Sequence, residues 1–179
     1  PSRARATLAA CSRARPPPGS PPLPCATRSR ARGIARPTPV TEGRRRLAIF
    51  SSNELFCLDL DGNLRWLRGL TVDYPNARNS LGMASSLVLA GGVLVAQVEN
   101  DSESFTAGLD KQNGANLWKV NRPKSSNWTT AMVQKTKSGA EWVLLQSGKG
   151  IHAVNPKNGE VAWHYADGAS TIQIGRAHV

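Results

Sequence analysis

The stretch PKNGEVAW, Pro156 to Trp163, occurs in nearly the same form at two earlier places in the chain. The earlier copies are LDGNLRW, Leu60 to Trp66, and KQNGANLW, Lys111 to Trp118. In each copy a Gly is followed four residues later by a Trp, and the Trp residues are 52 and 45 positions apart. A period of this size, filled with short strands, is typical of propellers and similar repeat arrays.

Each copy has the residues of a tight hairpin. Asn-Gly and Asp-Gly favour such turns because Gly readily adopts a positive φ, and an Asp or Asn shortly upstream can bond the turn backbone. The Trp is expected to share a face with the residue two after Gly (Leu64, Asn116 or Val161) and to pack at an interface rather than to do chemistry. The predicted structural repeat residues are Asp59, Gly62, Trp66, Asp110, Gly114, Trp118, Asn155, Gly159 and Trp163.

The residue two before the Asp or Asn is always small. It is Cys57, Gly108 or Ala153. Because side chains alternate between the faces of a strand, a small residue here predicts a face on which another sheet packs closely.

Short apolar segments separated by Gly, Asn, Asp and Ser clusters predict strands, and no segment has a sustained helical period. The expected strands are 46–52, 55–60 and 63–69 in unit one, 85–90, 93–99, 104–110 and 115–120 in unit two, and 128–135, 141–147, 150–155 and 160–165 in unit three. Residues 36–45 are a poor first strand for unit one, because Pro37 and Pro39 lack the N–H donor. The predicted fold is all-β: antiparallel four-stranded blades forming a partial, open propeller of two whole blades and most of a third.

The basic charge of the chain lies almost entirely at its N-terminal end. Residues 1–46 contain eleven Arg and one acid, whereas residues 47–179 carry a net charge of +1. No aromatic residue interrupts the first 46 residues to stack on bases, so no nucleic-acid partner is expected. We predict that 1–36 is a disordered Arg/Pro-rich segment, whose composition is also that of GC-rich DNA translated in a wrong frame.

The remaining boundaries follow from the repeat. Residues 37–172 are assigned to about three incomplete blades. The tail 173–179 contains IGRAHV, which resembles a translated sequencing adapter and is excluded from fold reasoning. Cys11, Cys25 and Cys57 form no CxxC motif, so neither a disulfide framework nor a zinc site is predicted. No apolar run is long enough to span a membrane.

The repeat resembles that of pyrroloquinoline-quinone-type (PQQ-like) β-propellers, Ala-x-Asp-x-x-Thr-Gly-x-x-x-Trp. AVNPKNGEVAW is the best copy, with Asn155 in the Asp position and Asn158 in the Thr position. GLDKQNGANLW has Gly108 in the Ala position, and CLDLDGNLRW has Cys57 there and is one residue shorter before its Gly. The resemblance covers roughly residues 47–172.

The resemblance implies that the motif spans the third and fourth strands of a blade, that its Trp docks on a neighbouring blade, and that about eight blades close a ring. Remaining blades of the same chain and other proteins are therefore the expected partners. This bacterial family contains quinoprotein dehydrogenases, which hold the quinone and calcium on the ring axis, and scaffolds without a cofactor. It implies a periplasmic or secreted location.

The enzymes of the family have a disulfide between adjacent cysteines, and this chain has no adjacent cysteines. The sequence therefore favours a non-catalytic binding or scaffold module, with no catalytic, cofactor-binding or metal-binding residue predicted in this segment. The alternative is a part of a PQQ-dependent dehydrogenase whose active site lies in other blades, and only under it are PQQ and calcium expected.

A few other stretches have a functional as well as a structural interpretation. Glu99, Asp101 and Glu103 are either calcium ligands or ordinary solvated loop residues. SGKGI, residues 147–151, lacks the spacing of a phosphate-binding loop. His152 and His164 have no evident catalytic partner, and YPNARNS, residues 74–80, is a connector or a binding loop.

Overall fold

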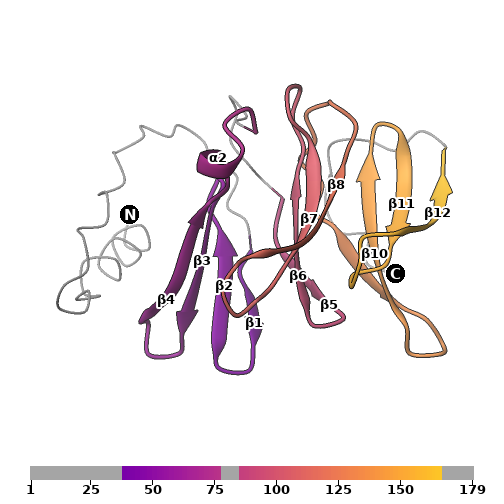
Figure 1. Ribbon diagram of the computed structural model, residues 1–179. Helices are drawn as coiled ribbons and strands as arrows, with labels where there is room; N and C mark the ends of the chain where they lie inside the picture. Colours follow the sequence, from indigo (N-terminus) through magenta and orange to yellow (C-terminus); the bar gives the residue numbers. More distant parts are fainter. Residues whose placement is uncertain (1–37, 78–84, 167–179) are drawn as a thin grey trace.

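The computed structural model describes residues 38–77 and 85–166, and within them the chain forms three four-stranded antiparallel sheets (Figure 1). The first sheet contains β1 (Val40–Glu42), β2 (Arg45–Ile49), β3 (Glu54–Asp59) and β4 (Leu64–Gly69). The second contains β5 (Val88–Ala90), β6 (Val93–Val98), β7 (Phe105–Leu109) and β8 (Asn116–Asn121). The third contains β9 (Met132–Lys135), β10 (Glu141–Ser147), β11 (Gly150–Val154) and β12 (Val161–Tyr165). Strands neighbouring in sequence pair in every sheet, which confirms the predicted all-β fold of four-stranded blades.

The first blade has all four strands, so three whole four-stranded sheets replace the expected two whole blades and most of a third, and the segment 36–45 does supply the first strand, though one of only three residues. β1 begins at Val40, directly after Pro39, and pairs with β2 through Val40 opposite Leu47 and Glu42 opposite Arg45. The prolines therefore limit where the strand starts, because they lack the N–H donor, but the three residues after them still pair.

The connections between strands lie at two opposite ends of the blades. The motif turns, which join the third and fourth strands, lie at the same end as the turns between the first and second strands, at the bottom of Figure 1. We call this the motif end. The turns between the second and third strands and the connections between blades lie at the opposite end, the loop end. One helical turn, α2 (Leu70–Asp73), opens the connection from the first blade to the second, and its Leu70 is buried.

A β-bulge occurs at the same point of all three motif hairpins. The strand register shifts between Cys57 and Leu58, between Gly108 and Leu109, and between Ala153 and Val154. In the second blade the extra residue leaves Asn116 opposite Leu109 and Trp118 opposite Gly108. Because neighbouring strand residues point to opposite faces, the Trp and the residue two after Gly lie on opposite faces. The expectation that they share a face is therefore wrong, because it did not include the bulge.

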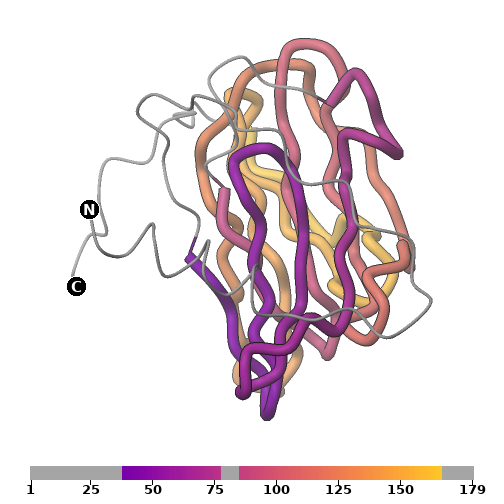
Figure 2. Tube along the Cα trace, turned by 90° about the vertical axis from the view of Figure 1, so that its left-hand side faces the viewer, coloured from indigo at the N-terminus to yellow at the C-terminus, as the bar shows by residue number. Residues whose placement is uncertain are grey.

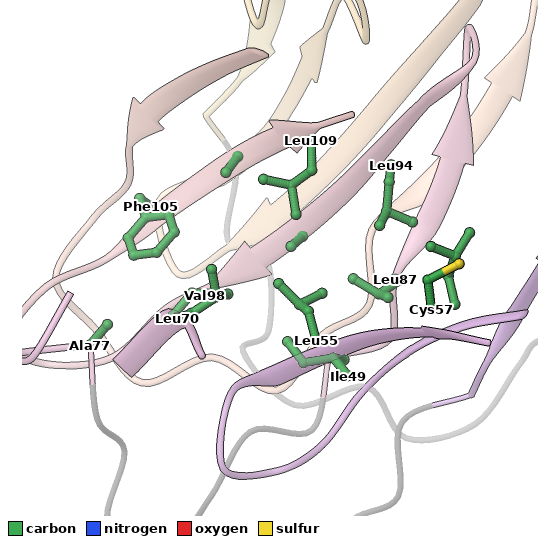
Figure 3. Packing of buried hydrophobic residues seen from close by; sticks show 13 residues of the cluster. Ile49, Leu55, Cys57, Leu70, Ala77, Leu87, Leu94, Val98, Phe105 and Leu109 are labelled. Carbon is green, nitrogen blue, oxygen red and sulfur yellow. The ribbon is translucent and has the colours of Figure 1, made fainter. Parts of the chain in front are cut away.

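The three sheets pack face to face in a row, which Figure 2 views end on. The trailing face of a blade is the one toward the next blade in sequence, and the leading face is the opposite one. Two buried clusters fill the two seams between blades. The first seam joins Leu47, Ile49, Leu55 and Cys57 of the first blade to Leu94, Ala96, Phe105 and Leu109 of the second (Figure 3). The second joins Val93, Val95 and Trp118 to Val143, Leu145 and Val154 of the third.

The two terminal faces of the row are not covered by any sheet of the described residues. Strand register places Phe56, Leu58, Leu64 and Leu67 on the leading face of the first blade, and Phe50, at the end of β2, stacks on Phe56. The trailing face of the third blade carries Met132, Trp142, Leu144, Ile151 and Trp163. The propeller formed by the described residues is therefore open, as predicted.

Several predictions about the ends of the chain concern residues outside the described ranges. These are the disorder of 1–36, the adapter-derived tail 173–179, both domain boundaries, Cys11 and Cys25. Cys57 is a free cysteine buried in the first seam, where burial raises the pKa of its thiol. In the part of the chain that the structure describes, no helix has the length and apolar character needed to span a membrane.

Candidate functional site

The motif Trp of one blade packs on the motif turn of the next blade. Nε1 of Trp66 donates a hydrogen bond to the carbonyl oxygen of Lys111 at 3.2 Å, and Nε1 of Trp118 donates to that of Pro156 at 2.8 Å. Lys111 and Pro156 each directly follow the Asp or Asn of their motif, so the two contacts are equivalent. Trp118 is 9% exposed, whereas Trp163, at the uncovered trailing face, is 46% exposed.

A glycine lies beneath each docked indole. A Cβ atom on Gly114 would lie 2.9 Å from Cζ3 of Trp66, and one on Gly159 would lie 2.6 Å from Cε3 of Trp118. Both glycines also have a positive φ, of 75° and 76°. Gly62 has a φ of 85°, but a Cβ on it would meet nothing within 4 Å. The motif glycine thus supplies the positive φ of the hairpin turn in each blade. In the second and third blades it also leaves room for the Trp of the preceding blade.

The small residue of each motif lies directly across the hairpin from the Trp of its own blade. The pairs are Cys57 with Trp66, Gly108 with Trp118, and Ala153 with Trp163. A Cβ on Gly108 would collide with the indole of Trp118. The faces that carry Cys57 and Gly108 are those on which the next sheet packs, as expected, and at Gly108 the Trp of the same blade leaves no room for a side chain.

The motif Asp and Asn side chains bond their own turns, as the sequence predicts. Their Oδ1 atoms accept hydrogen bonds from backbone N–H groups at 2.7–3.0 Å: Asp59 from Asp61 and Asn63, Asp110 from Gln112, and Asn155 from Lys157. The hydrogen bonds from Asn63 hold the pKa of Asp59 below its usual value. These three side chains therefore stabilise turns at the motif end.

The acidic residues of the second blade's loop end have separate partners. Glu99 is buried, Asp101 accepts hydrogen bonds from N and Oγ of Ser126 at 2.9 and 3.1 Å, and Glu103 pairs with Lys119 at 3.0 Å. Within residues 38–77 and 85–166, no group of three His, Cys, Asp or Glu side chains could hold a metal ion. The three carboxylates therefore bond three different partners in this structure: Arg122, Ser126 and Lys119.

Glu99 belongs to a buried polar network that sequence reasoning missed. Its Oε1 accepts a hydrogen bond from Nε of Arg122 at 2.7 Å, and its Oε2 accepts one from Nδ2 of Asn127 at 2.7 Å. The side chains of Glu99 and Arg122 are only 1% and 3% exposed. Asn127 also donates to the carbonyl of Gln146 in the third blade at 2.6 Å, and Arg122 donates to that of Leu145 at 3.5 Å. The network therefore joins the second and third blades at the loop end.

An open pocket of about 550 Å³ lies at the loop end beside this network. The residues that line it are all of polar or charged type: Asn76, Asp101, Ser102, Glu103, Ser104, Asn121, Arg122 and Lys124. The charges in this lining are of both signs, from Asp101 and Glu103 on the one hand and Arg122 and Lys124 on the other.

The two histidines stack on each other in the third blade. The ring centroids of His152 and His164 are 4.1 Å apart. Burial, reinforced by the nearby charge of Arg122, lowers the pKa of His152 to about 4, so this imidazole is neutral near pH 7. Nε2 of His164 lies 3.0 Å from the carbonyl oxygen of Lys149. Both are residues of the sheet, with no nucleophile among these contacts.

The two remaining loops also have structural roles. Ser147 to Gly150 form the turn between β10 and β11, and a strand rather than a helix follows, so the phosphate-loop interpretation is excluded. In the segment 74–80, the ring of Tyr74 lies 4.7 Å from that of Phe105, and its hydroxyl accepts a hydrogen bond from Asn116 at 2.8 Å. Residues 78–80 lie outside the described ranges.

Comparison with known families gives a match over most of the chain. A family model described as outer membrane protein assembly factor BamB matches residues 23–176. No curated protein sequence matches the chain at a significant level.

Solved structures share the fold at low identity. BamB from Moraxella catarrhalis is 16% identical with a TM-score of 0.52, over 73% of this chain and 35% of that one. The quinohemoprotein alcohol dehydrogenase ADHIIG from Pseudomonas putida HK5 is 12% identical with a TM-score of 0.60, over 78% and 28%. The corresponding enzyme from Comamonas testosteroni is 17% identical with a TM-score of 0.57, over 75% and 21%. The chain thus spans about a third or less of each of these proteins.

Alanine substitution of the motif glycine tests the Trp–turn contact. Gly159 and Gly139 both have a positive φ, but a Cβ would contact an indole only at Gly159. We expect Gly139→Ala to reduce the free energy of unfolding by about 1–2 kcal/mol, through backbone strain alone. Gly159→Ala should cost about 1–3 kcal/mol more because of overpacking. Urea unfolding measures the free energy of unfolding of both variants. Equal losses of this free energy in the two variants would show that the indole does not constrain Gly159.

Removal of charge from the two neighbouring ion pairs tests the buried network. Glu99→Gln leaves Arg122 buried without a counter-charge and should cost about 3–5 kcal/mol of unfolding free energy. The matched variant Glu103→Gln breaks a partly exposed pair and should cost about 0–1 kcal/mol. Comparable losses of unfolding free energy in the two variants, measured by chemical denaturation, would contradict the difference in burial between the two ion pairs.

Proposed function

The chain belongs to the family of the outer membrane protein assembly factor BamB, and on that premise we propose that this segment is a non-catalytic scaffold or binding module of PQQ-like blades. The module acts outside the cytoplasm, in the periplasm or as a secreted protein, and its partner is another protein. The observation that supports this most directly is that the repeat residues have structural roles between blades. Trp66, Trp118, Gly114 and Gly159 build the seams between blades.

The loop end is the surface proposed for the partner. Connections at blade ends are exposed segments on a rigid frame, and such segments often carry binding residues. The pocket there presents Lys124 beside Asp101 and Glu103, so it offers both cationic and anionic groups to a polar partner. The buried Glu99–Arg122 pair beneath it holds the two blades that carry these loops.

Site-specific photo-crosslinking in a bacterial envelope extract tests this surface. A photoreactive residue at Ser102 or Lys124, at the loop end, should give adducts with one and the same discrete protein. The matched position is Lys137, which is exposed in the turn between β9 and β10 at the motif end. Adducts at Lys137 but not at the loop-end positions would place binding elsewhere and contradict the proposed surface.

A part of a PQQ-dependent dehydrogenase is the second candidate, supported by the TM-scores of the two alcohol dehydrogenases, which exceed that of BamB. Under the preferred proposal this segment by itself holds neither quinone nor calcium. Glu99, Asp101 and Glu103, the only clustered acids at a described loop end, are bonded to Arg122, Ser126 and Lys119.

Cofactor binding separates the two candidates. Equilibrium dialysis of the chain with pyrroloquinoline quinone and calcium should give no stoichiometric binding at micromolar concentration. A dye-linked dehydrogenase assay with alcohols and sugars should give no turnover above background. Stoichiometric binding or turnover would favour the dehydrogenase over the scaffold.

A further inference from the structure

Two of the motif turns contain the dipeptide Asn-Gly, the sequence most prone to spontaneous loss of the side-chain amide. These are Asn113-Gly114 and Asn158-Gly159, at positions where the family's repeat has Thr-Gly. Because Gly has no side chain, its backbone nitrogen is unhindered when it attacks the preceding Asn. We propose that Asn113 and Asn158 are sites of conversion to isoaspartate, and that the Trp docked from the preceding blade controls the rate at each.

The reaction needs only the chain and water. The backbone nitrogen of the Gly attacks Cγ of the Asn, and the side-chain nitrogen leaves as ammonia, taking the proton of the Gly nitrogen. Water then opens the resulting succinimide ring at one of its two carbonyl carbons. Opening at one carbon gives Asp. Opening at the other gives isoaspartate, in which the main chain runs through Cγ and is one methylene longer.

The reacting groups of the third blade's turn are bonded to other atoms. N of Gly159 donates a hydrogen bond to the carbonyl oxygen of Asn155 at 2.8 Å, and Oδ1 of Asn158 accepts one from N of Glu160 at 3.1 Å. Asn158 is exposed to water, whereas Gly159 is buried beneath Trp118, whose Cε3 lies 2.6 Å from the position of a Cβ. Attack requires the Gly nitrogen to leave its hydrogen bond and move toward Cγ, and the indole opposes this movement.

The turn of the second blade has the same arrangement under a different indole. N of Gly114 donates to the carbonyl oxygen of Asp110 at 2.7 Å, and Oδ1 of Asn113 accepts from N of Ala115 at 2.8 Å. Asn113 is exposed, and Gly114 is buried beneath Trp66, whose Cζ3 lies 2.9 Å from the position of a Cβ. The two sites share their local chemistry and differ in the Trp that covers them, so each is a control for the other.

Isoaspartate at either site prevents the Trp from docking again. In the second seam Trp118 bonds the carbonyl oxygen of Pro156 and packs on Gly159, and Asn158 lies between these two residues. An added methylene at Asn158 changes the spacing of the two groups that the indole contacts together. Each conversion therefore makes the opening of its seam permanent. These chemical steps do not depend on what the segment binds.

Incubation of the wild-type chain at mildly alkaline pH, with and without guanidinium chloride, tests control by the fold. Peptide mass spectrometry measures amide loss at each site over time. The native chain should lose amide at Asn113 and Asn158 at least about tenfold more slowly than the unfolded chain, because the reaction then requires a local opening of the seam. Asn63, exposed but followed by Leu64, is the internal control and should react slowly in both states. Equal rates in the native and unfolded chains at Asn113 and Asn158 would overturn the proposal.

Exchange of each Trp for Phe separates control by the individual indole from overall stability. Phe keeps an aromatic ring but removes the N–H that bonds the turn carbonyl. Trp66→Phe should accelerate amide loss at Asn113 by about fivefold or more and leave Asn158 unchanged, because the buried carbonyl loses its donor. Trp118→Phe should do the reverse. Equal acceleration at both sites in either variant, or no acceleration at all, would overturn control by the docked indole.

Hydrogen exchange after prolonged incubation tests the effect on the seam. Wild-type chains that contain isoaspartate at position 158 should lose the protection of the backbone amide of Gly159. Asn158→Thr, which has no side-chain amide to lose, should keep this protection. Asn158→Asp carries the added charge without the added methylene and should keep it also. Retained protection of Gly159 in the isoaspartate chains, or its loss in Asn158→Asp, would contradict the assigned role of the longer main chain.

Discussion

Each blade is held to the next by an indole that lies on a glycine turn and donates its N–H to a backbone carbonyl. The contact is possible only if no side chain separates the ring from the turn. Gly114 and Gly159 supply that space, and Gly108 supplies the space on the other side of Trp118. The β-bulge after each small residue turns the Trp toward the next blade. The positions of the sheets relative to one another therefore depend on a few glycines, which have no side chain.

The two seams combine this contact with different polar groups. In the first, Nη1 of Arg68 donates to the carbonyl of Gly114 at 2.6 Å and to Oδ1 of Asn116 at 2.7 Å. In the second, the buried pair of Glu99 and Arg122 lies at the loop end. A buried ion pair adds little net stability compared with apolar packing, but breaking it is costly. A displacement of the third blade relative to the second that separates Glu99 from Arg122 would therefore be costly at the loop end of this seam.

Much of the blade architecture could be predicted from the sequence, because the hairpin residues are local. Gly159, Asn155 and Trp163 lie within nine residues, so their spacing alone predicts strand, turn and strand. The bulge was not predicted, because the small residue that precedes it in each motif was interpreted only as a packing position, and the predicted face of Asn116 was therefore wrong. The Glu99–Arg122 pair was missed because its members lie 23 residues apart. Its one local signal was an acid directly after the wholly buried strand β6.

The docked Trp recognises main-chain atoms and the absence of a side chain, and this affects how such an array can change over time. Residues as different as Lys111 and Pro156 supply the accepting carbonyl, so that position can vary freely in type. A duplicated blade would meet its new neighbour through groups that every blade already has. Genes of this kind can gain or lose units without matched changes in the neighbouring units, and the sequences of their blades can diverge widely while the stacking stays the same.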